Sequence, residues 1–113
     1  MSTSSRARDH GLSRAFRASE RYQTEAKALG ARIRAVRHAR GMSLYQASEA
    51  TSVELRHLQR LESGVLNVTL VTLLRVADGL GVPVWVLLGG PLPEQLPPLS
   101  NRPHKEADAS TAK

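Results

Sequence analysis

Side chains that commonly perform covalent or metal chemistry are scarce in this sequence. It contains no cysteine, which excludes disulfides, thiolate metal sites and cysteine nucleophiles. The four histidines, at positions 10, 38, 57 and 104, lack the spacing of metal ligands. Asp/Glu pairs with a catalytic spacing are absent, and the single Gly-Gly pair follows a predicted helix rather than a strand. We therefore expect no enzyme activity, no metal and no cofactor.

The polar side chains best placed for recognition lie between residues 54 and 62. Helical spacing puts Leu58 and Leu61 on the inner face of this stretch. The outer face then carries Arg56, His57, Gln59 and Arg60. Such a face offers hydrogen bonds and positive charge to a partner, so we expect non-covalent binding rather than catalysis.

The charge of the chain indicates the kind of partner. Its 113 residues carry a formal net charge of +6, and the isoelectric point is near 10.8. The charge is uneven: residues 1–60 contain 12 Lys/Arg against 5 Asp/Glu, whereas residues 61–113 contain 4 against 5. A basic first half favours a polyanion such as nucleic acid, or an acidic surface.

Targeting signals are weak. The Ser- and Arg-rich N-terminus faintly resembles a transit peptide, but Asp9, Glu20 and Glu25 and the lack of an apolar signal core argue against export. No apolar run approaches the roughly 18 residues needed to span a bilayer. We expect a cytoplasmic protein that does not bind a membrane.

Five short helices must position the polar face, and they predict an all-α domain at residues 28–90. The expected ranges are 28–40, 44–50, 54–62, 70–80 and 83–88. Gly41 caps the first, and Ser43 with Gln46 forms a capping box that starts the second. Aromatic residues make up only 4% of the chain, so the core must consist of Leu, Val, Ile and Ala.

Segments on both sides of this domain differ from it in composition. Residues 1–27 are predicted to form a basic arm that is partly helical. The first core helix could extend back into the arm as one long helix, or two helices could meet near Lys27; we favour a core helix from about Ala28 with a helical extension before it. Residues 91–113 are Pro-rich and then polar, which is typical of an extended and then disordered tail.

The domain carries several linked motifs: LGARIRAVRHARGMS, then QASEATSVELRHLQRLESG, then TLVTLLRVADGLGVPVWVLLGG. Together they resemble the phage repressor/Cro type of helix-turn-helix domain, also called XRE-type, over residues 29–90 without a gap. The resemblance implies a five-helix phage-repressor-like bundle that binds double-stranded DNA. In that family the second helix of the two-helix unit enters the major groove, while the first crosses the backbone.

The resemblance also implies roles for individual residues. The base-contacting side chains would be Leu55, Arg56, Gln59 and Arg60. Phosphate contacts would come from Arg32, Arg34, Arg40, Ser43, Tyr45 and His57. A buried ion pair between Arg37 and Glu62 would tie the first helix to the end of the recognition helix.

Three positions depart from the family pattern. Leu44 replaces the usual Gln that bonds phosphate, Ser52 replaces the usual Gly of the turn, and the loop 65–68 reads Val-Leu-Asn-Val where the family usually has a polar or basic loop. These changes weaken phosphate anchoring. The arginines of the arm could compensate along the duplex or in the minor groove: Arg6, Arg8, Arg14, Arg17 and Arg21.

Trp85 stands where the family tends to place an exposed Asp or Glu. With Leu66 and Val68 it predicts an apolar patch and a homodimer interface; the alternative is that Trp85 folds onto the tail at 91–99. We expect a transcriptional repressor. Two alternative functions remain. The chain could be an antitoxin or similar module that binds a protein through the arm or tail, or a helix-turn-helix scaffold that has lost DNA binding.

Overall fold

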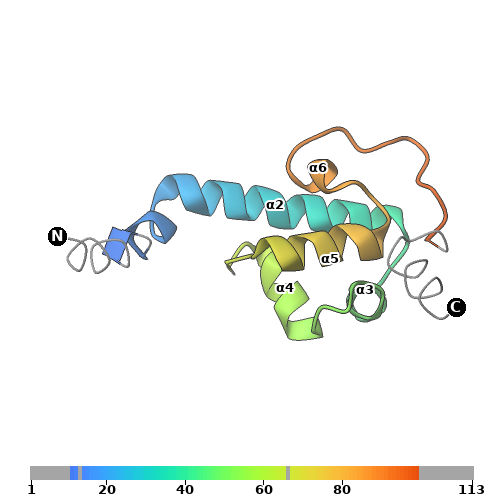
Figure 1. Ribbon diagram of the computed structural model, residues 1–113, viewed down its shortest axis with the longest axis horizontal. Helices are drawn as coiled ribbons and strands as arrows, with labels where there is room; N and C mark the ends of the chain where they lie inside the picture. Colours follow the sequence, from blue (N-terminus) through green and yellow to red (C-terminus); the bar gives the residue numbers. More distant parts are fainter. Residues whose placement is uncertain (1–10, 13, 66, 100–113) are drawn as a thin grey trace, which may run out of the picture.

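A computed structural model describes residues 11–12, 14–65 and 67–99 of the chain (Figure 1). The described part contains helices and no strand. The bundle consists of α2 (Glu20–Ala39), α3 (Leu44–Thr51), α4 (Leu55–Ser63), α5 (Leu70–Leu80) and α6 (Val84–Leu87), and residues 11–12 and 14–17 before α2 are also helical. The expected all-α, five-helix bundle is therefore confirmed.

Helix α2 is the longest element; α4, α5 and α6 pack against it, α3 packs against α4 and α5, and the N-terminal part of α2 extends beyond them (Figure 1). It is one continuous helix of 20 residues. Ser19 caps its start by accepting a hydrogen bond from the Tyr22 N–H at 3.2 Å. The favoured start near Ala28 was wrong: the core helix and its extension are a single helix from Glu20. Gly41 follows its end with a φ of +68°, as expected for a glycine after a helix.

The core lies between α2 and the four shorter helices. Its fully buried side chains are aliphatic, as the low aromatic content requires: Ile33, Val36, Leu58, Leu61, Val76, Leu80 and Leu87. No helix in the described ranges is long and apolar enough to cross a membrane.

Gly30 explains how closely α2 and α4 approach. A Cβ atom at this position would lie 2.5 Å from the Glu62 carbonyl oxygen and even closer to that of Leu61. Glycine lowers helix stability by about 1 kcal/mol relative to alanine. Here it allows the backbone of α2 to contact the end of α4, which positions α4.

The Pro-rich segment 91–99 continues from α6 and turns back over the bundle (Figure 1). Leu96 packs against the hydrophobic core. Leu99 lies against Gly81, where a Cβ would come within 2.6 Å of its side chain. This part of the tail is therefore docked onto the domain. The basic residues Arg6 and Arg8, and residues 100–113, lie outside the described residues.

Candidate nucleic-acid interface

The turn between α3 and α4 is held by side-chain hydrogen bonds. Thr51 Oγ1 donates to the Ala47 carbonyl at 2.7 Å and accepts from the Val53 N–H at 3.2 Å. Ser48 Oγ donates to the Val53 carbonyl at 2.6 Å. Ser52 has the left-handed conformation, with φ 57° and ψ 31°. The turn is thus fixed although it lacks the usual glycine, at a strain of about 1–2 kcal/mol.

Sequence reasoning did not identify the roles of Ser48 and Thr51 in this turn. Ser and Thr side chains beside a helix end commonly form hydrogen bonds with nearby backbone groups. This preference could have indicated that Ser48 and Thr51 hold the turn. Both side chains hold the turn between α3 and α4, so they help to fix the direction of α4.

The N-terminus of α3 carries the predicted capping box. The Gln46 N–H donates to Ser43 Oγ at 3.0 Å, and the Ser43 N–H donates to Gln46 Oε1 at 2.9 Å. The N–H groups of Leu44 and Tyr45 make no hydrogen bond to another described residue. They are therefore available to an anion such as phosphate, which the partial positive charge of a helix N-terminus favours.

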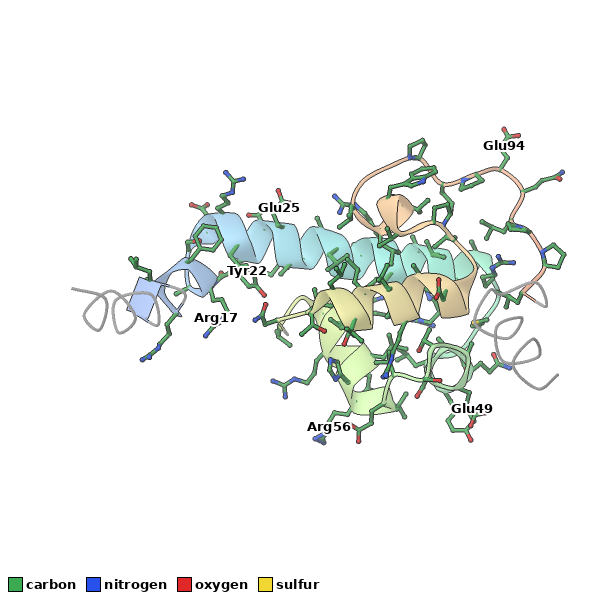
Figure 2. The ribbon with its side chains drawn as sticks, viewed as in Figure 1. Arg17, Tyr22, Glu25, Glu49, Arg56 and Glu94 are labelled. Carbon is green, nitrogen blue, oxygen red and sulfur yellow. The ribbon has the colours of Figure 1, made fainter. Side chains whose placement is uncertain are left out.

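Helix α4 has one buried and one exposed face. Leu58 and Leu61 are 0% and 2% exposed. The opposite face exposes four side chains: Leu55, Arg56, Gln59 and Arg60. Arg56 projects from the start of α4, away from α2 (Figure 2). The two arginines are one turn apart, and neither forms an ion pair with a described residue, so both guanidinium groups can meet an external acceptor.

Arg37 and Glu62 form a buried, two-bond ion pair. Arg37 Nε lies 2.6 Å from Glu62 Oε2, and Nη2 lies 2.9 Å from Oε1. Arg37 Nη1 also donates to the Met42 carbonyl at 3.0 Å. The hydrogen bond to Glu62 raises the pKa of the Arg37 guanidinium group above its ordinary value. The pair joins α2, the approach to α3 and the end of α4.

Two residues from the predicted phosphate set are engaged elsewhere. Arg32 donates to the Leu87 carbonyl at the end of α6, at 3.1 Å. Arg40 donates to the Leu80 and Gly81 carbonyls at 2.8 and 3.1 Å, where the positive charge stabilises the C-terminus of α5. Both guanidinium groups therefore stabilise the ends of α5 and α6. Their predicted contact with phosphate stays a prediction.

The other side chains predicted to contact phosphate differ in exposure. Arg34 is 57% exposed at its side chain, although its Nε also lies 3.4 Å from Glu62. Tyr45 is 64% exposed, and a hydrogen bond to Glu49 raises the pKa of its phenol. His57 is half-buried, and its Nε2 atom is buried without a hydrogen-bond partner among the described residues. Arg34 and Tyr45 are therefore better placed for phosphate than His57.

The three residues predicted for a dimer interface occupy different environments. Trp85 is 48% exposed, and its ring lies against Gly90, next to the start of the tail. Val68 is half-buried and packs against the core. Leu66 lies outside the described residues. No group of His, Cys, Asp and Glu in the described ranges could hold a metal ion.

A helix-turn-helix domain family matches residues 28–85. The fold is similar to the crystal structure of the restriction-modification controller protein C.AhdI from Aeromonas hydrophila, with a TM-score of 0.55 and 26% identity over 57% of this chain and 97% of that one. No curated protein matches. The family match covers half of the chain and includes both α3 and α4. The chain therefore belongs to the helix-turn-helix domain family.

Proposed function

We propose that the chain is a sequence-specific DNA-binding transcriptional regulator, a repressor that inserts α4 into the major groove as a homodimer. One observation carries the proposal: α4 buries Leu58 and Leu61 while it exposes Arg56, Gln59 and Arg60. The major groove, about 12 Å wide, admits one helix and displays a distinct donor–acceptor pattern for each base pair. The similarity to a controller protein supports a regulatory role.

The contacts divide into two kinds. Arg56 and Arg60 would each form paired hydrogen bonds to guanine O6 and N7, with Gln59 beside them, and Leu55 would contact a thymine methyl. The N-terminus of α3, at Ser43 and Tyr45, would bind phosphate together with Arg34. Exposed arginines of the arm, at positions 14, 17 and 21, would add charge near the duplex.

A homodimer would place two copies of α4 about 34 Å apart, one turn of DNA, on a two-fold symmetric site. Two recognition helices double the number of base contacts, which offsets the weak anchoring at Leu44. We expect the interface to include Val68 and Trp85, together with Leu66.

A footprint on the DNA upstream of the chain's own gene tests the proposal. We expect protection of two half-sites one helical turn apart, at concentrations where shuffled DNA of equal composition is unprotected. Equal protection of the two duplexes would contradict sequence-specific binding. Absence of salt-sensitive binding to both would contradict DNA binding altogether.

A further inference from the structure

A groove with a volume of about 230 Å³ runs along the N-terminal half of α2. Its α2 side is formed by residues spaced three or four apart, which places them on one helical face; Ala26 and Leu29 are the apolar members. The apolar part of the groove also includes Leu61 of α4, Val68 of the α4–α5 loop, and Leu88 at the end of α6. The groove therefore has an apolar centre that is open to a partner.

Two opposite charges on α2 face this groove. Glu25 and Arg32 both line it. They are seven residues apart, which is two helical turns or about 10.5 Å along the same face. Neither forms an ion pair with a described residue, and the one hydrogen bond of Arg32, to the Leu87 carbonyl, leaves other guanidinium donors free.

We infer that a second copy of the chain occupies this groove through the same face of its own α2. In a two-fold contact, residue i meets residue j of the partner, and j meets i. Two antiparallel α2 helices centred between residues 28 and 29 would bring each Glu25 opposite the Arg32 of the other copy. The symmetric dimer then contains two Glu25–Arg32 ion pairs, and Ala26 and Leu29 are buried between them. This inference rests on the proposed homodimer and extends its interface from Val68, which lines the groove, onto α2.

Exposed apolar side chains around the groove agree with a protein partner. Leu88, which lines it, is 60% exposed. Val65 and Leu70, which flank the lining segment 67–68 in the chain, are 62% and 67% exposed. Large apolar patches of this kind commonly mark interfaces. Glu25 and Ala26 precede the family match at residue 28, so this part of the surface is a feature of this chain beyond the matched domain.

Charge reversal of the full chain tests the pairing, with sedimentation velocity as the readout. Glu25→Arg places a second guanidinium group against Arg32 in both symmetric contacts, and Arg32→Glu places two acids together. Each variant alone should dimerise about tenfold or more weakly than the wild type. A mixture of the two variants should form a heterodimer, because both contacts are then attractive, and the double variant should regain dimerisation. Glu20→Arg makes the same charge change on α2 outside the groove and should dimerise normally.

Rescue in the mixture separates pairing from misfolding, since a misfolded variant cannot be rescued by a partner. If both single variants dimerise like the wild type, a second copy does not occupy this groove, and a small ligand or residues 1–10 become the candidate occupants. If the variants lose dimerisation but neither the mixture nor the double variant regains it, the Glu25–Arg32 pairing is wrong. The proposed function fails separately, if the wild-type chain shows no sequence-specific footprint.

Discussion

At the scale of single residues, Glu62 is the side chain on which the position of α4 depends most. It is 6% exposed and accepts hydrogen bonds from both Arg37 and Arg34. We expect Glu62→Ala to lower the free energy of unfolding by about 3–5 kcal/mol, because Arg37 would remain buried without its partner. Urea denaturation measures this change.

Arg34→Ala is the matched control, since it removes the exposed partner of the same carboxylate. We expect it to cost no more than about 1 kcal/mol, as is usual for exposed ion pairs. Equal losses for Glu62→Ala and Arg34→Ala would mean that burial does not determine the strength of this cluster.

At the scale of elements, the contact between α2 and α4 determines the outcome of Gly30→Ala. Helix propensity alone predicts a gain of about 1 kcal/mol. The added Cβ would clash with the Leu61 and Glu62 carbonyl oxygens, and overpacking of this kind costs about 1–3 kcal/mol or more. We expect a net loss of stability in thermal denaturation. A higher melting temperature for Gly30→Ala would show that the two helices do not approach this closely.

The same contact shows what the sequence could and could not reveal. The capping box at Ser43 and the left-handed turn at Ser52 are local, and the sequence identified both positions. The resemblance to a known family supplied the Arg37–Glu62 pair. The hydrogen bonds of Arg32 and Arg40 were not predicted, because their acceptors are carbonyls 55 and 40 residues away in the chain. Charge and periodicity describe a residue's own helix, and they do not reveal which helix end will fold beside it.

The start of α2 was missed for a related reason. Gly30 and the charged residues before it suggested a boundary near residue 28, but Ser19 caps the helix earlier and the helix continues without a break. The groove along α2 also depends on three segments distant in sequence, so no local motif could reveal it.

At the scale of the whole molecule, salt dependence should separate phosphate contacts from structural arginines. Each phosphate contact contributes about 0.9 to the slope of log binding constant against log salt. Arg34→Ala should therefore reduce the slope by about one contact. Arg40→Ala should leave the slope unchanged, because that side chain bonds to the Leu80 and Gly81 carbonyls. A reduced slope for Arg40→Ala would show that Arg40 also contacts phosphate.

The exposed face of α4 is the surface that we propose reads base pairs. Selection of binding sites from randomised duplexes by the wild type, Arg56→Ala and Arg60→Ala tests this claim. We expect each variant to lose its preference at one base pair per half-site, by about 1–3 kcal/mol, and to keep it elsewhere. Unchanged site preferences in both variants would contradict the claim.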